Sequence, residues 1–513
     1  MTLPGTSIVV LDFGGQYTQL IARRIREARV FSVVLPPNAP PDEITKWNPA
    51  GVILSGGPQS VYEKDAPVPA PGYLDLNLPT LGLCYGMQWL AHVDGGEVLG
   101  GKGREYGRAT ATVDPTSELF HGLETGQTVW MSHGDSVTRP PAGARVIAST
   151  ADTPIAGFEN PARSLYAIQF HPEVNHTEHG TAILQNFLFR VCGVKPDWSM
   201  ASFRQEKIRE IRGQAPSGAV VCALSGGVDS SVTAILLREA LGERVHPILV
   251  DHGLMRADEA RQVVEAFASL GIAVRSVDAS DLFLGRLEGV SDPEEKRKII
   301  GRTFIEVFER EARQIPEARY LAQGTLYPDV IESVSIKGPS QVIKTHHNVG
   351  GLPEKLGLKL IEPVRELFKD EVRLLGAELG LPREFLARHP FPGPGLAVRI
   401  PGPVSREKVA ILQKADAIVL DEIRKAGLYD AISQAFAVLL PVKTVGVMGD
   451  NRTHEFVLAV RAVQTTDFMT ADWFRMPHDV LDAIASRVIR EVRGINRVVY
   501  DVTSKPPATI EWE

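Results

Sequence analysis

A lone cysteine lies between an apolar run and a helix-like stretch in the first fifth of the chain. In "LGLCYGMQWLA", residues 81–91, Gly82 and Gly86 flank Cys84. Small residues at these places are typical of a tight turn from a strand into a helix. A thiol on such a turn lies at a helix N-terminus, where unpaired N–H groups favour the thiolate. Free cysteines are more often buried apolar residues, so this stretch alone leaves both a nucleophile and a core position open.

A base and an orienting carboxylate follow in "QFHPEV", where His171 and Glu173 lie two residues apart. At the end of a strand this spacing turns both side chains to one face. The carboxylate then reaches Nδ1–H of the imidazole while Nε2 faces a thiol. Alone, the pair equally fits a histidine that caps a strand beside a solvated glutamate. With Cys84 in the same predicted domain, it favours a Cys–His–Glu triad.

An oxyanion hole needs two backbone donors near that cysteine. The stretch "LSGGP" (54–58) ends a predicted strand, and the N–H group of Gly57 is one candidate. The N–H group of Tyr85, directly after the nucleophile, is the other. A Ser-Gly-Gly-Pro run is weak evidence by itself, because it also fits a plain loop.

The most specific motif is "SGGVDSS", which directly follows the apolar strand "AVVCAL" (219–224) and opens a helix. Glycines there let backbone N–H groups approach an anion closely, and the helix N-terminus adds its dipole. No Gly-Lys-Ser/Thr follows, so the motif is not a Walker A loop. Asp229 suits Mg²⁺ bridging to phosphates, or it caps the helix. We expect this loop to bind ATP through Ser225, Gly226, Gly227, Val228, Asp229, Ser230 and Ser231.

Three further groups of polar residues are weaker candidates. Asp329 and Glu332 follow a strand end and suit either metal ligands or a solvated turn. The aperiodic, glycine-containing stretch 336–353 reads as a lid, whose cations would close over a polyphosphate. Near the end of the chain Lys505 precedes two prolines that restrict the backbone, in a terminus whose apolar residues predict docking rather than fraying. The candidate lid residues are Lys344, His346, His347 and Asn348.

Composition limits the class of protein. The 513 residues are 44% hydrophobic and 23% charged, which fits a globular protein of two to four domains. Three cysteines make no disulfide framework and favour a reducing cytoplasm. We see no membrane-span-length apolar run and no signal peptide, and the net charge of -7 argues against a broad nucleic-acid surface. The expectation is a cytoplasmic enzyme with neither a membrane nor a nucleic acid as partner.

The elements that must position these residues follow two α/β patterns. Apolar strands are predicted at 7–14, 30–36, 51–58, 79–84 and 165–173, with a helix after the first, which indicates a partly parallel sheet. A second run begins at 219–224 and continues through strands at 245–251, 273–280 and 319–325, a doubly wound pattern. Residues 404–513 read as helix, strands, helix and strand.

Together these residues resemble the glutamine-hydrolysing GMP synthase family, over nearly the full length. "GLCYGMQ" and "QFHPEV" resemble class I glutamine amidotransferases, and "SGGVDSS" is similar to the pyrophosphatase-type ATP loop. "HHNVGGLP", "RHPFPGPGL" and "SKPPATIEWE" are the most specific segments. The resemblance implies α/β architecture: a class I amidotransferase domain (1–192), a linker (193–200), a doubly wound adenine-nucleotide α-hydrolase-like ATP domain (201–395) and an α+β C-terminal dimerisation and XMP-binding domain (396–513).

The resemblance also implies a reaction and roles. Cys84 would be the nucleophile, His171 its base and Glu173 the orienting group, releasing ammonia from glutamine. With Mg²⁺, ATP would adenylate xanthosine 5′-monophosphate (XMP), and ammonia would convert the adenylyl-XMP to GMP. A homodimer is implied. The residues that the resemblance assigns to XMP are Arg297, Gln434, Lys505, Ile510 and Glu511.

Three other classes share parts of the pattern. A tRNA-modifying enzyme would share 219–325 but would need a basic, aromatic-laced RNA surface and a different N-terminal domain. A nucleotide-sensing scaffold would lack an intact triad. A cysteine peptidase would not need the ATP loop.

Overall fold

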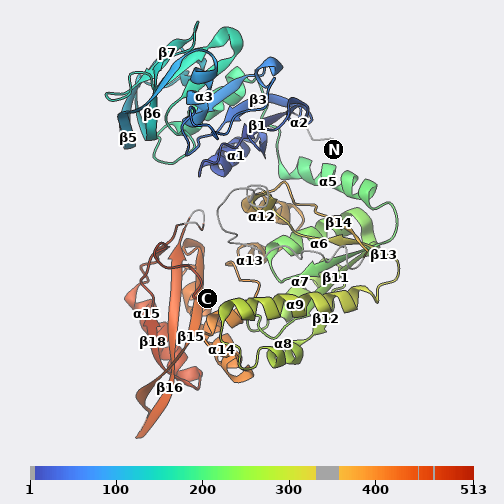
Figure 1. Ribbon diagram of the computed structural model, residues 1–513. Helices are drawn as coiled ribbons and strands as arrows, with labels where there is room; N and C mark the ends of the chain where they lie inside the picture. Colours follow the sequence, from blue (N-terminus) through green and yellow to red (C-terminus); the bar gives the residue numbers. More distant parts are fainter. Residues whose placement is uncertain (1–5, 331–356, 449, 466–467, 469) are drawn as a thin grey trace. The chain divides into compact units, whose positions relative to one another are not determined.

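The computed structural model describes residues 6–330, 357–448, 450–465, 468 and 470–513. The chain forms two compact units, Met1–Glu206 with Pro328–Gln341 and Lys207–Tyr327 with Val342–Glu513. Each unit is built around its own sheets (Figure 1).

The first unit is organised by a nine-stranded sheet in the order β2-β1-β3-β4-β9-β8-β7-β5-β6. The strands β1, β2, β3, β4 and β9 pair in parallel, whereas β5 to β8 join by antiparallel pairing. The sheet is therefore partly parallel, as predicted. Its strands are β1 Ser7–Leu11, β2 Phe31–Leu35, β3 Pro49–Leu54, β4 Thr80–Leu83, β5 Glu97–Val113, β6 Gly126–Arg139, β7 Arg145–Ser149, β8 Gly157–Asn160 and β9 Leu165–Ile168.

The helices α1 and α3 pack on this sheet. In α1 the buried residues Ile21, Ala22 and Ile25 recur at helical spacing, and the charged residues fall between them. The helix α3 is apolar nearly all round and is buried along most of its length. The helices are α1 Thr18–Glu27, α2 Pro41–Thr45, α3 Tyr85–Val93 and α4 Gly180–Gln185, with the 3-10 helices η1 Leu74–Leu76, η2 Glu118–Phe120 and η3 Pro161–Arg163 and the π-helix η4 Asn186–Val191. The next helix, α5 Met200–Gln214, crosses the boundary between the two units.

The second unit contains a five-stranded parallel sheet in the order β12-β11-β10-β13-β14. The chain leaves the central β10 toward β12 and then returns to β13 on the other side, which is the doubly wound topology predicted from the sequence. The switch point beside β10 is where such folds bind ligands. The strands are β10 Ala219–Leu224, β11 Val245–Asp251, β12 Arg275–Asp278, β13 Ala318–Ala322 and β14 Lys359–Ile361.

Helices flank the parallel sheet, and the long α9 runs beside its strands (Figure 1). Asp292 caps α9 by accepting a hydrogen bond from the Glu295 N–H group, and Pro293 occupies the first turn. The elements are α6 Val228–Leu241, η5 Gly242–Arg244, α7 Glu259–Ser269, α8 Ser280–Arg286, α9 Pro293–Ala312, α12 Lys369–Glu378, α13 Arg383–Leu386 and η6 Gly395–Arg399.

The C-terminal part adds a second sheet in which β15 and β16 form a long antiparallel hairpin and β18 pairs in parallel with β16. Buried apolar residues of the parallel sheet, α14, α15 and this second sheet form one contiguous core. The elements are α14 Arg406–Lys425, η7 Tyr429–Ala431, β15 Gln434–Met448, β16 Asn451–Gln464, β17 Asp472–Trp473, α15 His478–Glu491 and β18 Ile495–Tyr500.

The linker predicted at 193–200 contains no helix or strand before Met200, but it is partly packed. Trp198 is buried, contacts the Phe31 ring, and donates its backbone N–H group to the Arg29 carbonyl. In the described part of the chain, every helix falls short of the length and apolar character needed to cross a membrane.

Candidate active sites

Cys84 occupies the turn between β4 and α3. Its backbone has φ 51° and ψ -104°, a conformation that few residues other than glycine adopt. The Cys84 N–H group donates to the Ile168 carbonyl of β9 at 2.9 Å, and Sγ lies 3.7 Å from the Ser132 carbonyl oxygen. The turn therefore presents the thiol at the N-terminus of a helix, which is the geometry of a nucleophile elbow.

The two glycines around this turn are required by close packing. A Cβ atom on Gly82 would lie 2.7 Å from the carbonyl of Gly86, and one on Gly86 would lie 2.5 Å from the Leu54 oxygen. Real Cβ atoms essentially never come that close to backbone atoms. The tight strand-to-helix turn expected from the sequence is present.

His171 and Glu173 form a buried pair. The Nδ1 atom of His171 lies 2.7 Å from Oε1 of Glu173. The Glu173 side chain has no exposed surface, and that of His171 is 6% exposed. The carboxylate therefore fixes the imidazole with Nδ1–H directed at Glu173 and leaves Nε2 for another partner.

The strand geometry predicted for this pair is wrong. The strand β9 ends at Ile168, so His171 and Glu173 lie on a turn beyond it rather than on one face of a strand. The turn is held by other contacts: the His171 N–H group donates to the Trp130 carbonyl, and Oγ1 of Thr177 donates to the His171 carbonyl at 2.6 Å. The side chains meet because this turn is anchored to β6, which the local sequence does not reveal.

The environment of His171 favours its charged form. Burial alone would lower the pKa of the imidazole, but the attraction of Glu173 and a hydrogen bond with Cys84 outweigh it. The pKa of His171 therefore lies well above its usual range. A protonated histidine beside a thiol favours the thiolate, which is the reactive form of cysteine.

The "LSGGP" turn lies against this cluster. A Cβ atom on Gly56 would lie 3.2 Å from Cε1 of His171 and 3.6 Å from Cβ of Cys84. One on Gly57 would lie 3.2 Å from the Tyr85 ring. Of the two residues predicted to form an oxyanion hole, Tyr85 directly follows Cys84, and Gly57 lies against the Tyr85 ring; the glycine shown beside Cys84 is Gly56.

Sequence reasoning missed three residues around the cluster. The Tyr17 ring packs edge-on against the His171 ring at 5.1 Å, and Nε of Arg24 donates to the Glu173 carbonyl at 2.9 Å. His133 is buried on β6, and burial lowers its pKa. The polar run "SHGD" within an otherwise alternating strand was the one signal that could have identified His133.

The glycine loop (225–231) connects β10 with α6 at the switch point of the parallel sheet. Gly226 has φ +80°, and a Cβ atom there would lie 2.9 Å from Cε of Met255, so only glycine fits without strain. Ser225 and Gly227 are exposed, whereas Val228 and Ser231 are buried under the loop. Hydroxyl groups brace the turn: Oγ of Ser230 accepts from the Ser225 N–H group, and Oγ of Ser231 donates to the Gly227 carbonyl at 2.9 Å.

Asp229 lies in the first turn of α6, and Nζ of Lys369 is 3.9 Å from its Oδ2 atom. Its carboxylate at a phosphate-type loop fits Mg²⁺, which takes one or two carboxylates plus phosphate oxygens. Asp329 lies in the helical stretch 327–330. No cluster of three or more metal-ligating side chains is found among the described residues. Glu332 and the whole predicted lid, with Lys344, His346, His347 and Asn348, lie outside those residues.

Two of the residues that the resemblance assigns to XMP touch each other. Nε2 of Gln434, at the start of β15, donates to Oε1 of Glu511 at 2.7 Å. Arg399 holds the same carboxylate through Nε and Nη2, and its guanidinium lies over the Phe436 ring at 4.1 Å.

Arg297 and Ile510 are tied to the same C-terminal tail. Nη2 of Arg297 donates to the backbone oxygen of Glu513 at 2.6 Å, and the neighbouring Lys296 binds the Glu513 carboxylate. Ile510 is buried, and its carbonyl accepts a hydrogen bond from Arg461. The terminus is docked, as its composition predicts.

Lys505 lines an open cavity of about 690 Å³ beside this tail. Its backbone pairs with Ala471 through two hydrogen bonds, and Nζ donates to the Phe468 carbonyl at 2.7 Å. The other lining residues are mostly small or polar and include the neighbour of Gln434: Ala431, Ser433, Gln464, Thr465, Thr470, Ala471, Asp472 and Ser504. A cation among hydroxyl groups suits a phosphate.

Three family profiles match successive parts of the chain. The profile for glutamine amidotransferase class I matches residues 9–191, that for NAD synthase matches 201–298, and that for the GMP synthase C-terminal domain matches 421–512. A solved structure, a putative GMP synthase subunit from Thermoplasma acidophilum, covers 40% of this chain and 99% of its own at 32% identity, with a TM-score of 0.33.

Curated relatives match over nearly the full length. A glutamine-hydrolyzing GMP synthase from Chlorobium luteolum is 55% identical over 515 residues, which covers 99% of this chain and 100% of the relative. One from Brucella suis is 58% identical over 512 residues, with 99% and 98% covered. The chain therefore belongs to the family of glutamine-hydrolysing GMP synthases.

Proposed function

We propose that the chain makes GMP by ATP-dependent amination of XMP with ammonia that it releases from glutamine. The observation that carries the proposal is the juxtaposition of Cys84, His171 and Glu173 in the first unit, in a chain whose second unit has a glycine loop at its switch point. A peptidase would need only the first feature, and a nucleotide sensor only the second.

In the first unit, Sγ of Cys84 attacks the amide carbon of glutamine, and the N–H groups of Gly57 and Tyr85 stabilise the oxyanion. His171 holds the proton that the thiol loses and passes it to the departing ammonia, while Glu173 keeps the ring in place. A thioester forms at Cys84, and water hydrolyses it to glutamate. The hydrogen bond from His171 to Glu173 at 2.7 Å supports this division of roles.

In the second unit, the glycine loop holds the phosphates of ATP through its backbone N–H groups and serine hydroxyls. Mg²⁺, held by Asp229, would neutralise phosphate charge when bound. The C2 oxygen of XMP attacks the α-phosphate, pyrophosphate leaves, and ammonia then displaces AMP from adenylyl-XMP to give GMP. Lys505 binds the XMP phosphate in its cavity, while Gln434 and Glu511 contact the rest of the nucleotide.

We also propose a homodimer in the cytoplasm. The strand β15 exposes Val442, Val445 and Val447, and Val447 is 75% exposed. An apolar strand of this kind suits pairing with a second copy. All three cysteines are free thiols, which suits a reducing compartment. Val447→Glu should lower the molar mass seen by light scattering from dimer to monomer, whereas Val146→Glu, a change at an exposed valine of the other unit, should not.

The decisive experiment measures GMP, AMP and pyrophosphate with purified protein, XMP, ATP and Mg²⁺, and either glutamine or ammonia. Equal amounts of GMP, AMP and pyrophosphate from both nitrogen donors are expected. ATP cleavage to ADP, or GMP formation that requires no XMP, contradicts the proposal.

A further inference from the structure

The turn after β11, residues 252–258, lies against the glycine loop. A Cβ atom on Gly226 would lie 2.9 Å from Cε of Met255 and 3.5 Å from Oε1 of Glu259. The other carboxylate oxygen of Glu259 accepts the backbone N–H group of Arg256 at 3.0 Å. One side of this turn is thus fixed beside the proposed ATP site by the hydrogen bond between the Arg256 N–H group and Glu259, whose carboxylate the Arg256 guanidinium also attracts.

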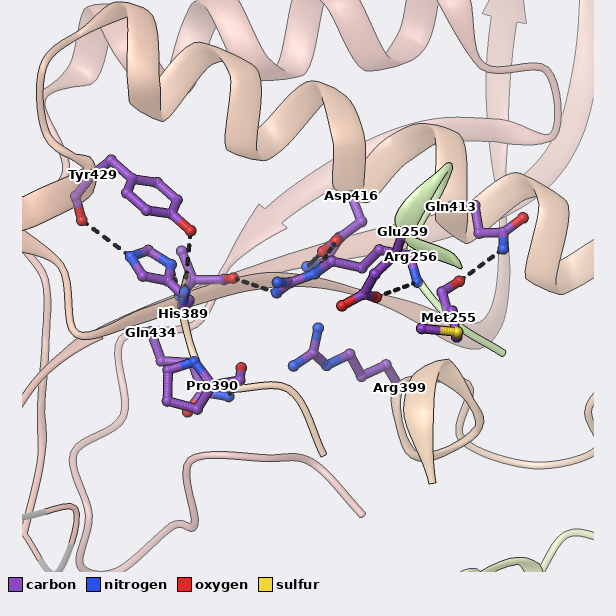
Figure 2. Close-up of polar contacts among 12 residues, drawn as sticks. Met255, Arg256, Glu259, His389, Pro390, Arg399, Gln413, Asp416, Tyr429 and Gln434 are labelled. Atoms are coloured by element: carbon purple, nitrogen blue, oxygen red, sulfur yellow. Dashed lines mark hydrogen bonds and ion pairs between the residues drawn. The ribbon is translucent and has the colours of Figure 1, made fainter. Parts of the chain in front are cut away.

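The Arg256 side chain reaches the C-terminal part of the same unit, where it contacts Asp416 (Figure 2). Nε of Arg256 lies 3.1 Å from Oδ2 of Asp416 on α14, and Nη2 lies 3.5 Å from the Ala435 carbonyl of β15. The side chains of Arg256 and Asp416 are 14% and 2% exposed. The Arg256 guanidinium also lies over the Phe391 ring at 4.9 Å.

Asp416 ties this ion pair to the backbone of β15. Its second oxygen, Oδ1, accepts the N–H group of Ala437 at 2.9 Å. One buried carboxylate thus holds Arg256 with one oxygen and the strand with the other. Because both partners are nearly buried, the pair keeps one geometry in a way that an exposed pair does not.

The first residues of β15 carry the proposed XMP contact. Gln434 precedes Ala435, whose carbonyl faces Arg256, and the Ala435 N–H group donates to Nδ1 of His389 at 3.2 Å. Nε2 of His389 is hydrogen-bonded to the Tyr429 carbonyl, and burial lowers the pKa of His389 to about 4, so this ring stays neutral. The start of β15 is therefore fixed from both sides, with Arg256 providing the link to the turn beside the glycine loop (Figure 2).

We propose that Arg256 is a positioning residue for XMP: its guanidinium, through Asp416 and the Ala435 carbonyl, fixes Gln434 relative to the turn that lies against Gly226. The inference rests on the proposed function and deepens it. In-line attack on the α-phosphate requires that XMP and ATP are held in a fixed position relative to each other. The inference assigns this positioning to the Arg256 side chain, which touches neither nucleotide.

The test uses the full chain with ammonia as nitrogen donor, so that glutamine hydrolysis does not limit the rate. Arg256→Met removes the guanidinium but keeps the main-chain N–H group that holds Glu259. We expect the KM for XMP to rise about tenfold, the loss of one charge-assisted contact, while the KM for ATP changes by less than about twofold. Glutaminase activity at Cys84 should stay unchanged.

Arg487→Met is the matched control. Arg487 lies on α15 and pairs with Asp421 and Glu422 of α14, the helix that carries Asp416. Its loss removes a guanidinium that binds α14, while the contacts of Arg256 with Asp416 and Ala435 remain. The control should leave the KM for XMP unchanged. A purely structural role of Arg256 would lower the melting temperature without a selective change in the KM for XMP, and that result overturns the inference.

Arg256→Lys keeps the charge beside Asp416 but gives up the second donor to Ala435, and it decides the question if the methionine variant does not fold. A selective rise in the KM for XMP supports the positioning role, and an unchanged KM overturns it. If the wild-type protein forms no GMP from XMP, ATP and ammonia, the proposed function itself fails. If it forms GMP and the Arg256 variants keep the wild-type KM for XMP, the positioning role alone fails.

Discussion

The guanidinium of Arg399 binds both carboxylate oxygens of Glu511, at 3.1 Å through Nε and 2.8 Å through Nη2. The Arg399 side chain has no exposed surface, so its buried charge is stabilised by Glu511 of the C-terminal tail rather than by water. Lys296 and Arg461 are equally buried, and they too bind the tail, at Glu513 and at the Thr509 carbonyl. Three buried cations from separate elements therefore hold the last residues in place.

Arg399→Met should destabilise the fold strongly. The methionine keeps much of the apolar packing against Phe391 and Phe436, but Glu511 loses its charged partner. Breaking a buried pair costs about 3 kcal/mol in free energy of unfolding, and an exposed one costs less than about 1 kcal/mol. Urea denaturation should separate Arg399→Met from Arg490→Met, which removes an exposed pair with Glu491. Equal losses in the two variants would contradict the importance of the tail contact.

Cys84→Ala should abolish GMP formation with glutamine and spare it with ammonia. The thiol serves only to release ammonia, and the alanine fits the space of the buried cysteine without disturbing the elbow. Rates with the two nitrogen donors, measured side by side on one preparation, check this. Equal loss with both donors would show that the first unit is needed for more than glutamine hydrolysis.

Glu173→Gln should reduce the part of the free energy of unfolding that depends on protonation of His171. In the wild type the pKa of His171 is raised, despite burial, by the attraction of Glu173 and by hydrogen bonds with Cys84 and Glu173. A raised pKa contributes stability that is fully present below the pKa of an unfolded histidine, about 6.5, and is lost as the pH rises through the folded value. The difference in free energy of unfolding between wild type and variant should thus be larger near neutral pH than at alkaline pH. Denaturation curves at both pH values test the sign, and a difference that grows with pH refutes it.

Most of the architecture could be predicted because apolar periodicity and glycine turns are local signals. The helix after the first strand, the parallel strands of both units and the doubly wound order follow from such signals, and "SGGVDSS" marks its loop by sequence alone. The class I amidotransferase match over 9–191 confirms the first fold. The long antiparallel strands β5 and β6 were missed, although the residues in the first half of β6 alternate between buried and less buried positions.

What could not be predicted depends on contacts between distant residues. The meeting of His171 with Glu173 was expected for a wrong reason, since the turn is fixed by Trp130 and Thr177 rather than by strand geometry. The role of Arg256 is invisible in sequence, because Asp416 lies 160 residues away. Pairing across such distances is set by the tertiary fold, which no local pattern encodes.

Asp229→Ala should abolish synthesis with glutamine and with ammonia alike. The carboxylate at the start of α6 is the proposed anchor for Mg²⁺ on ATP, and alanine provides no oxygen ligand. Pyrophosphate release from ATP and XMP should fall to background, while glutamate formation from glutamine stays measurable. The alternative role expected from the sequence, a helix cap, does not fit the structure, because Gly227 is the N-cap of α6 and Asp229 lies within its first turn. Asp229→Asn keeps the size of the side chain but removes the charge that Mg²⁺ requires, so near-wild-type synthesis by this variant would mean that Asp229 does not hold Mg²⁺.

Lys505→Ala should weaken XMP binding selectively. Nζ of Lys505 donates to the Phe468 carbonyl at the edge of an open cavity that Ser433, Thr465, Thr470 and Ser504 also line. Two backbone hydrogen bonds with Ala471 hold the lysine's position, so the alanine variant keeps the tail docked and loses only the ammonium group. A charge-assisted contact with phosphate contributes roughly 1.5–3 kcal/mol, and the KM for XMP should therefore rise about ten- to a hundredfold.

The KM for ATP and the glutaminase rate should change far less, because Lys505 and Ser433 line a cavity to which no residue of the glycine loop contributes. Xanthosine, which lacks the phosphate, provides the matched probe: as a competitor of XMP it should bind wild type and Lys505→Ala equally weakly. A lysine that is merely solvated would cost almost nothing to remove. An unchanged KM for XMP would place the phosphate elsewhere than in this cavity. The same conclusion would follow if Lys505→Ala weakened the binding of xanthosine as much as the binding of XMP.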